Sequence, residues 1–387
     1  MIGRVDIHLY RQNNTLNTNV IPKIYIIEMA TPREDNYHMP GEFESHALTW
    51  MAFPHRIDNW RNNAKNAQKT MSDLANLVSK FEKVIMIVPR RCMRAALSSV
   101  DETVSIVVGE TDDAWVRDTG ATFVTNGKEI RGVSWKFNAW GGVVNGLYSS
   151  WKNDEKIAEF MCKIQGVQMY KPSFILEGGS IHVDGDGTCM TTKECLMDVG
   201  RNSHFTGAEL EENLKKYLNV EKIIWLDYGV VDDETNGHID NMACFARPGE
   251  VILAWTDDKE HPQYKRSKAA YDYLSAIKDA KGRKLIVHKM HTPDDMFITE
   301  EEANGVMNSG EAVARIAGDR LAASYVNFIM PNGAIIFPKF GDEKYDKLAE
   351  EQFKRIFPER QVIGFYSREL LLGGGNLHCL TQQVPYL

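Results

Sequence analysis

Apolar and polar positions follow one arrangement that occurs five times along the chain: two short strands, an amphipathic helix and a buried strand. The buried strand of the first copy is VIMIV at 84–88, and its helix carries apolar residues at helical spacing: Ala64, Ala67, Met71, Leu74 and Val78. Later copies have hairpin turns at 126–127, 184–187, 248–249 and 332–333, and helices at 157–164, from Thr206 onward, at 264–278 and at 343–356. Their buried strands are expected at 223–226, 285–288 and 361–366.

The C-terminal strand NLHCLTQQ, at 376–383, is left over from these copies. We expect it to pair with HALTWMAF at 46–53 and to close a ring, which leaves few exposed strand edges and creates a central hollow. No linker divides the ring, so the prediction is an α/β fold of five ββαβ units in one domain over 29–387. Residues 1–28 show little periodicity, and Met29 begins a more natural N-terminus. We therefore interpret 1–28 as an extension that function does not need.

Composition and charge narrow the class of protein. The 387 residues are 43% hydrophobic and carry a net charge of −8, with Lys and Arg scattered along the chain, which argues against a nucleic-acid-binding protein. No apolar run approaches the roughly 18 residues that a membrane helix needs, and the N-terminus lacks the apolar core of a signal peptide. The six cysteines have no C-x-x-C spacing, so we expect reduced thiols in a cytoplasmic protein.

Unusual polar residues occur at the corners where the predicted hairpins begin, each with glycine nearby. They are Asp118, Glu177, His238, Asp240 and, on the closing strand, Cys379. Because equivalent corners of a ring meet at its centre, we expect these side chains to surround the hollow. The sequence GGSIHV at 178–183 also resembles GGNLHC at 374–379, which predicts a glycine-lined entry at both places. The fifth hairpin contributes no obvious polar residue.

This set contains one thiol, one imidazole and three carboxylates. A cysteine near a histidine is the usual arrangement for nucleophilic catalysis, because the thiolate reacts and a cationic neighbour lowers the thiol pKa. Three carboxylates would instead raise the thiol pKa, and burying them without partners costs free energy. A cationic substrate removes both problems, and a guanidinium matches carboxylates with paired hydrogen bonds. The residues therefore predict attack by a thiolate on a guanidinium carbon, with an acid to protonate departing ammonia.

Five motifs carry a resemblance to a known family. They are WVRDTG at 115–120, LEGGSIHVDGDG at 176–187, TNGHIDN at 235–241, AGDRLAASYVN at 317–327 and GGGNLHCLTQQ at 373–383. Together they resemble the agmatine deiminases, from about Met29 to the C-terminus. That family belongs to the pentein superfamily, so the resemblance implies a five-fold α/β propeller with the active site at its centre.

The resemblance also implies the reaction. Cys379 would be the nucleophile and would form a covalent amidino-cysteine (thiouronium) intermediate. His238 would protonate leaving ammonia and would then activate water as a general base. The products of agmatine would be N-carbamoylputrescine and ammonia, in putrescine biosynthesis or in agmatine breakdown, with no metal and no organic cofactor.

Four further residues receive binding roles from the same resemblance. Asp118 and Asp240 would hold the guanidinium, Glu177 would help to bind it and to orient His238, and Trp115 would form a wall of the site. The expected partner is therefore a small cationic substrate, with neither nucleic acid nor membrane, and the protein is expected to be a homo-oligomer, either a dimer or a tetramer.

Three alternatives stay open. One is a metal site, because His238, Asp240, His182 and His378 offer nitrogen and oxygen ligands, although no H-E-x-x-H motif is present. Another is a deiminase of free or peptidyl arginine, which would use the same chemistry; free arginine requires a basic residue for its α-carboxylate, and the sequence does not locate one. The third is a non-catalytic pentein-fold binding module, which would lack the Cys-His-carboxylate set. The other five cysteines are interpreted as buried small hydrophobic side chains.

Overall fold

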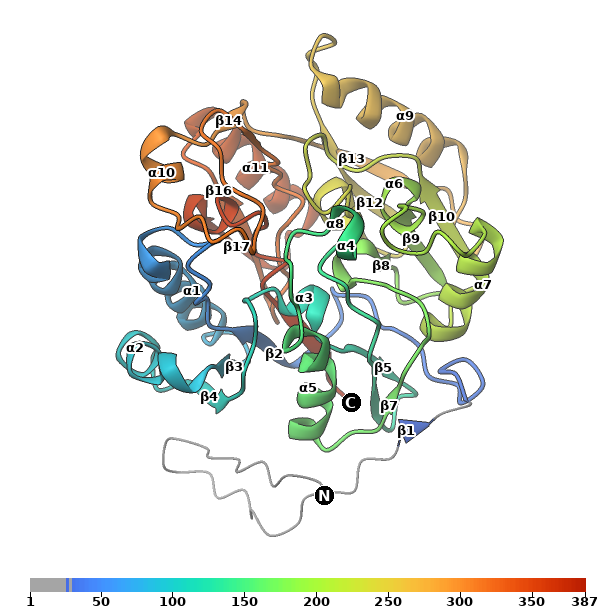
Figure 1. Ribbon diagram of the computed structural model, residues 1–387. Coiled ribbons are helices and arrows are strands. Elements are labelled where there is room, and N and C mark those ends of the chain that lie inside the picture. The colour runs from blue at the N-terminus through green and yellow to red at the C-terminus, as the bar shows by residue number, and fades with distance from the viewer. Residues whose placement is uncertain (1–25, 28–29) are drawn as a thin grey trace.

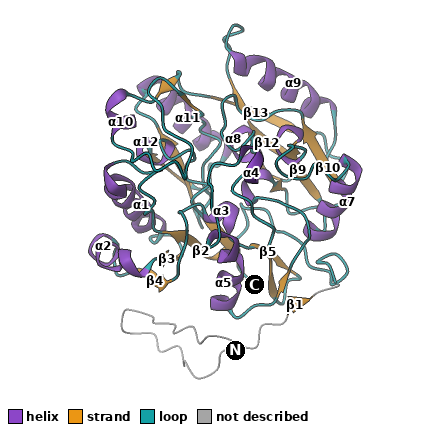
Figure 2. Cartoon of the chain, in the orientation of Figure 1, coloured by secondary structure: helices purple, strands orange, loops and turns teal. Residues whose placement is uncertain are grey.

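The computed structural model of the protein describes residues 26–27 and 30–387. Among them the strands form six small sheets, and five of these sheets, each packed against at least one helix, surround a common centre (Figure 1). The longer helices lie at the rim, while short helices and loops fill the middle (Figure 2). This is the five-fold α/β propeller that the repeated pattern predicts.

Each of these five sheets, together with its helices, is called a blade. Blade one contains β2 (His46–Ala52), β3 (Lys83–Val88), β4 (Val104–Val108), β18 (Gln382–Pro385), α1 (Lys65–Val78) and α2 (Met93–Ser99). Blade two contains β1 (Ile26–Ile27), β5 (Thr122–Thr125), β6 (Ile130–Val133), β7 (Met169–Tyr170) and α5 (Ile157–Gln165). Blade three contains β8 (His182–Val183), β9 (Thr188–Thr192), β10 (Lys222–Leu226), α6 (Lys193–Leu196) and α7 (Gly207–Leu218).

The remaining blades follow in chain order around the ring. Blade four contains β11 (Ala243–Arg247), β12 (Glu250–Trp255), β13 (Ile286–His291) and α9 (Pro262–Ala276), and blade five contains β16 (Ala334–Lys339), β17 (Gln361–Tyr366), α11 (Glu343–Ile356) and α12 (Arg368–Leu371). Between them lie β14 (Met296–Phe297), α10 (Glu300–Asn304) and β15 (Arg320–Leu321). Two more short helices, α3 (Val116–Thr119) and α8 (Ile239–Met242), lie at the centre, and α4 (Gly142–Asn145) lies in front of it in the view of Figure 1.

The ring closes through the C-terminal strand. β18 pairs antiparallel with β2, with Gln382 opposite Trp50, as predicted. The strand begins later than expected, because residues 377–380 form a turn in which the Leu380 amide donates to the Leu377 carbonyl at 3.3 Å. The prediction that Cys379 lies on the closing strand is therefore wrong, and the residue lies in the turn that precedes it.

The predicted hairpins are present, but their first strands are short. The turns at 126–127 and 248–249 join antiparallel strands, and near 332–333 a single bridge joins Ile329 to Ile336. In blades three and four, single helical turns at 178–180 and 239–242 replace residues expected to be extended. A four-residue turn is too short to show a helical period, so the hydrophobic pattern does not reveal it. The pattern also missed α2 and β4.

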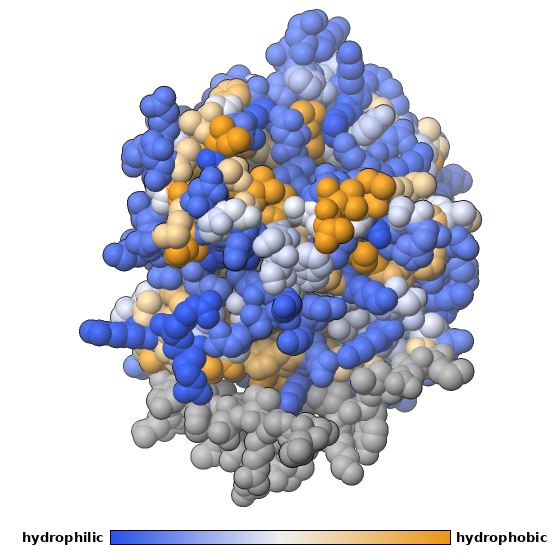
Figure 3. Space-filling model, in the orientation of Figure 1, coloured by the Kyte–Doolittle hydropathy of each residue, from blue (hydrophilic) through white to orange (hydrophobic). Residues whose placement is uncertain are grey.

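Three hydrophobic clusters stabilise the blades. One lies in blades one and two around Trp50, a second in blades four and five around Phe245 and Phe353, and a third between blades two and three around Leu214. All six cysteines are free thiols. The face seen in Figure 3 is mostly hydrophilic, and one of its apolar patches lies over α4, where Val143 is 97% exposed.

Two predictions concern the N-terminus and membranes. Most of the predicted extension 1–28 lies outside the described residues, although β1 pairs parallel with β7. That function does not need this extension stays a prediction. Among the residues that the structure describes, no helix combines the length and apolar character needed to span a bilayer.

Candidate active site

Three single helical turns meet at the centre of the propeller: α3, the turn Gly178–Ser180 and α8 (Figure 1). Asp118 lies on α3, Glu177 immediately precedes the second turn, and His238 and Asp240 lie at the start of α8. None of these four residues is more than 4% exposed. The structure therefore brings the predicted corner residues together in a buried site.

Gly179 lies in the middle of this group. A Cβ atom at this position would lie 2.5 Å from His238 Nδ1, 2.9 Å from Asp118 Oδ1 and 3.0 Å from Asp240 Oδ2. Side chains essentially never approach a Cβ atom below about 3 Å, so only glycine allows these three groups to converge. Gly179 is thus needed for close approach around the site.

Cys379 reaches the same group from the turn before β18. Its Sγ atom is 3.6 Å from Asp240 Oδ2 and accepts a hydrogen bond from Asn327 Nδ2 at 3.2 Å. Gly374 has a φ of +106°, which L side chains rarely adopt, and a Cβ atom on Gly375 would lie 3.1 Å from the thiol sulfur. The glycines therefore let the chain turn sharply and bring the thiol beside α8.

Asp118 is held by two donors. Trp140 Nε1 donates to Asp118 Oδ2 at 2.8 Å, and the Gly179 amide donates to Oδ1 at 2.9 Å. Burial raises the pKa of Asp118, and the carboxylates of Asp240 and Glu177 raise it further against the attraction of His238. This carboxylate therefore gains stability as an anion when a cation binds beside it.

Glu177 has a cation of its own. Arg201 Nε donates to both carboxylate oxygens of Glu177, at 2.9 and 3.1 Å. Burial alone would raise the pKa of Glu177, but Arg201 and His238 outweigh burial and lower the pKa to about 2. Glu177 is therefore a permanent anion beside His238, with Oε2 3.7 Å from Nε2 of that ring.

His238 lies between two carboxylates but is held loosely. Its Nδ1 is 3.9 Å from Asp118 Oδ1, and its buried Nε2 forms no hydrogen bond to any of the described residues. Burial alone would lower the pKa of His238, yet the neighbouring carboxylates of Asp118 and Glu177 outweigh burial and raise the pKa well above its ordinary value. The raised pKa favours the protonated ring, which has a proton to give.

The thiol of Cys379 is kept neutral by its surroundings. Burial raises the pKa of Cys379 well above its ordinary value, and the carboxylates of Asp240 and Asp118 raise it further. Burial also opposes the charge of Asp240, but His378 and His238 outweigh it and lower the pKa of Asp240. The site is thus rich in negative charge, and a bound cation would favour ionisation of the thiol.

Trp115 lies beside the thiol turn. Its ring stacks on Trp60 at a centroid distance of 5.2 Å, and its Nε1 donates to Asp113 Oδ2 and Tyr148 Oη, both at 3.1 Å. A Cβ atom on Gly375 would lie 2.6 Å from the Trp115 ring. The indole is therefore held against the segment that carries Cys379, where it can form a wall of the site.

Comparisons with known proteins identify the family. The model of the Porphyromonas-type peptidyl-arginine deiminase family matches residues 38–385. The chain belongs to this family. A relative from Pectobacterium atrosepticum, provisionally named an agmatine deiminase, is 50% identical over 358 residues, which cover 92% of this chain and 97% of the relative. A relative of the same name from Mycoplasma capricolum is 49% identical over 357 residues, which cover 92% and 98%.

Solved structures agree with this assignment. The agmatine deiminase of Enterococcus faecalis is 42% identical and superposes with a TM-score of 0.90 over 92% of this chain and 98% of its own. A cysteine-to-serine variant of the C. jejuni agmatine deiminase, solved with substrate bound, is 25% identical with a TM-score of 0.77 over 90% and 96%. The predicted resemblance to the agmatine deiminases and the predicted pentein fold are confirmed.

Several residues of this agmatine deiminase fold contact the site but were not predicted as site residues. Asn327 comes from blade five, so the fifth hairpin does contribute a polar group, and its position at the end of the AGDRLAASYVN motif was a usable signal. Trp140 and Arg201 lie in loops without periodicity, and nothing in the local sequence links them to Asp118 or Glu177. The contacts of His378 were also missed, because the motif at 373–383 was interpreted through the neighbouring Cys379.

Two groups of three residues among those described could offer ligand atoms to a metal, with the atoms of each group within 4.8 Å of one another: Glu42, His182 and His378, and Glu177, Cys195 and His238. Neither group is the ligand set that the sequence analysis considered, which was His238, Asp240, His182 and His378. In the first group both ring nitrogens of His378 already face carboxylate oxygens, and in the second Glu177 is bonded to Arg201. A metal ion would have to displace these contacts, so the donor sets do not fit one.

Proposed function

We propose that the chain hydrolyses agmatine to N-carbamoylputrescine and ammonia through a covalent intermediate on Cys379. The observation that carries the proposal is a buried thiol 3.6 Å from Asp240, whose Oδ1 atom is buried without a hydrogen-bond partner among the described residues. An unpaired buried carboxylate oxygen is costly, and a guanidinium N–H would satisfy it. The names of the relatives and of the solved structures support the same substrate.

Substrate binding would activate the nucleophile. A guanidinium beside Asp118 and Asp240 cancels the negative charge that raises the pKa of Cys379, so the thiol ionises more easily. Asp240 Oδ2, which faces the thiol, is the nearest acceptor for its proton. The thiolate then attacks the guanidinium carbon and forms an S–C bond, while His238 protonates the departing nitrogen and the C–N bond breaks. Ammonia leaves, and an amidino-cysteine remains.

Hydrolysis would reverse the roles of the same groups. After giving its proton, His238 is neutral and can accept a proton from a water that enters where ammonia left. The resulting hydroxide attacks the amidino carbon and forms a C–O bond, and the S–C bond breaks to release the thiolate. The hydroxyl proton of the product is lost to solvent as the carbonyl of N-carbamoylputrescine forms, and Asp240 returns its proton to the thiolate. Glu177, which stays ionised because of Arg201, stabilises the imidazolium in each half of the cycle.

The surroundings favour agmatine over the two arginine alternatives. Cys379 is only 6% exposed, so the site suits a small molecule better than a peptide chain. The α-carboxylate of free arginine would need a free cation, but two arginines near the thiol turn are already bonded. Arg117 bonds to the His378 carbonyl and Gln383, and Arg315 bonds to Glu234, Asn59 and the Gly373 carbonyl. Agmatine has no carboxylate and needs no such partner.

The test is an assay of the pure protein with agmatine, free arginine and a peptidyl-arginine, in which ureido product and ammonia are measured. Strong preference for agmatine and loss of turnover in Cys379→Ser are expected, whereas Cys92→Ser, which changes a thiol outside the site, should leave turnover unchanged. Mass spectrometry of a quenched reaction should find the mass of agmatine less ammonia on the Cys379 peptide. Turnover by Cys379→Ser, or preference for either arginine substrate, would contradict the proposal.

A further inference from the structure

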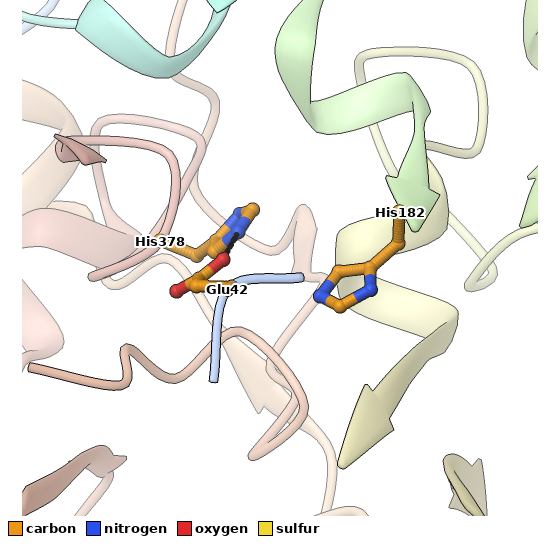
Figure 4. A group of neighbouring side chains, drawn as sticks. All are labelled: Glu42, His182 and His378. Atoms are coloured by element: carbon orange, nitrogen blue, oxygen red, sulfur yellow. Dashed lines mark hydrogen bonds and ion pairs between the residues drawn. The ribbon is translucent and has the colours of Figure 1, made fainter. Parts of the chain in front are cut away.

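His378 bridges two buried carboxylates directly behind the thiol. Its Nδ1 lies 2.9 Å from Asp240 Oδ2, and its Nε2 lies 2.7 Å from Glu42 Oε2. Figure 4 shows the Glu42 carboxylate turned toward the His378 ring, with His182 on a neighbouring segment. Ionised carboxylates only accept hydrogen bonds, so both ring nitrogens must donate and His378 is an imidazolium.

This bridge sets the orientation of Asp240. His378 bonds to Oδ2, the same oxygen that faces Cys379, while Oδ1 is buried and has no hydrogen-bond partner among the described residues. A carboxylate fixed at one oxygen cannot rotate freely, so the unpaired Oδ1 keeps one direction. A guanidinium N–H would donate a hydrogen bond to such a free, oriented carboxylate oxygen beside the nucleophile.

Glu42 anchors the bridge from the other side. It comes from the segment before β2 and lies 3.6 Å from Arg117 Nη2. Arg117 in turn donates from Nε to the carbonyl of His378 at 3.2 Å, and its amide donates to the carbonyl of Cys379 at 3.2 Å. One network thus joins α3, the segment before β2, the thiol turn and α8.

We propose that His378 and Glu42 are positioning residues that hold Asp240 ready for the guanidinium. The inference rests on the proposed function, because Asp240 must bind a cationic substrate for its orientation to matter. Neither residue needs to touch the substrate. His378 acts through Asp240. Glu42 acts through His378, because it accepts the second N–H hydrogen bond of the ring and stabilises its positive charge.

Two substitutions of His378 separate this role from a merely structural one. The amide of asparagine places a donor near the position of Nδ1, so His378→Asn keeps a bond to Asp240 and loses the one to Glu42. The amide of glutamine places a donor near the position of Nε2, so His378→Gln does the reverse. Both remove the ring and its charge, which makes them matched controls for stability.

The measurements are KM and kcat for agmatine and the midpoint of thermal unfolding. We expect KM to rise about 10- to 100-fold in His378→Gln, the usual effect of losing a hydrogen bond to a charged group, and clearly less in His378→Asn. Equal KM values in the two variants, or losses that simply follow the unfolding midpoints, would overturn the proposal. Wild-type protein measured in parallel separates the two proposals, because absence of agmatine turnover there contradicts the proposed function instead.

Glu42→Gln gives a second readout if neither His378 variant folds. The amide oxygen of glutamine can still accept the Nε2 proton, but the negative charge that stabilises the imidazolium is lost. Among the described residues, the other charged or titratable groups that face His378 are Arg117, Asp240 and His182, and all are unchanged. We expect KM for agmatine to rise about 10-fold in Glu42→Gln, because the ring loses the charge that holds it beside Asp240, whereas an unchanged KM would contradict the role of Glu42.

Discussion

The two histidines that act on Asp240 differ in how closely carboxylates hold them. His378 has a carboxylate oxygen within 2.9 Å of each ring nitrogen, whereas His238 lies 3.7 and 3.9 Å from Glu177 and Asp118. Both rings are buried, and the neighbouring carboxylates raise both pKa values against the effect of burial. Charge alone therefore does not distinguish them.

The distances suggest a division of labour. Each N–H of His378 donates in a short hydrogen bond to a carboxylate, which stabilises both protons where they are, so His378 is suited to a fixed position and a fixed charge. Neither Glu177 nor Asp118 lies within hydrogen-bond distance of the His238 ring, so a substrate nitrogen or a water can bond to that ring. His238, which lacks close hydrogen-bond partners, is therefore suited to move a proton, and His378, which has two, is suited to hold Asp240 in place.

The largest expected effect comes from replacing the loosely held ring. His238→Asn should lower kcat for agmatine roughly 10²- to 10⁴-fold, the range for loss of a general acid and base. Because Nε2 of His238 has no hydrogen bond to lose, we expect a smaller loss of folding free energy than in His378→Ala, which takes a hydrogen-bond donor from each of two buried carboxylates. Steady-state kinetics and denaturant unfolding of both variants test this contrast. A His238→Asn protein with near-normal kcat would remove the distinction between the rings.

A smaller loss should follow from filling the space around His238. In Gly179→Ala the new methyl group would lie 2.5 Å from Nδ1 of the ring, so His238 or its neighbours must shift. A displacement of about 1 Å at a reacting group costs on the order of 100-fold in rate, which is the loss of kcat/KM that we expect. Gly207→Ala is the matched control, because its new Cβ would make only an ordinary contact of 3.6 Å with Met197. Equal activities of the two variants would show that the site tolerates the methyl group.

The sequence predicted much of this arrangement, and the failures have physical causes. Long periodic segments were found accurately: the helix at 343–356 and the strand at 361–366 match α11 and β17. The corner residues were found because glycine and acidic residues recur where hairpins begin. The helical turns that carry Asp118 and Asp240 were missed because four residues show no period, and Asn327 was missed because its partner Cys379 is distant in the chain.

A loss of about 10-fold is expected from the donor that holds Asp118. Trp140→Phe keeps the aromatic packing but removes the Nε1 proton bonded to Asp118 Oδ2, which should raise KM for agmatine and raise the pKa of this carboxylate further. Trp135→Phe is the control, since it removes an equally short bond from a buried indole to Thr122, away from the site. The comparison of KM values decides: equal changes in both variants would mean that the bond to Asp118 has no special role.

The smallest effect on activity should come from His182, another buried histidine, whose ring lies 6.2 Å from that of His378. Burial lowers the pKa of His182 from 6.5 to about 4, so the folded state binds fewer protons than the unfolded state below pH 6.5. Its contribution to stability is therefore complete above that pH and falls as pH drops toward about 4. His182→Asn keeps an acceptor for the Phe245 amide, which now bonds to Nδ1, but cannot titrate.

Urea unfolding at pH 7 and pH 5 measures this contribution. The wild-type protein should lose about 2 kcal/mol more unfolding free energy between these two pH values than His182→Asn, because each pKa unit corresponds to about 1.4 kcal/mol. Activity at neutral pH should change little, since His182 is neutral there and its hydrogen bond is to the Phe245 amide. Parallel pH curves for the two proteins would mean that His182 titrates normally in the folded state, and the contrast between satisfied and unsatisfied histidines would then rest on His238 and His378 alone.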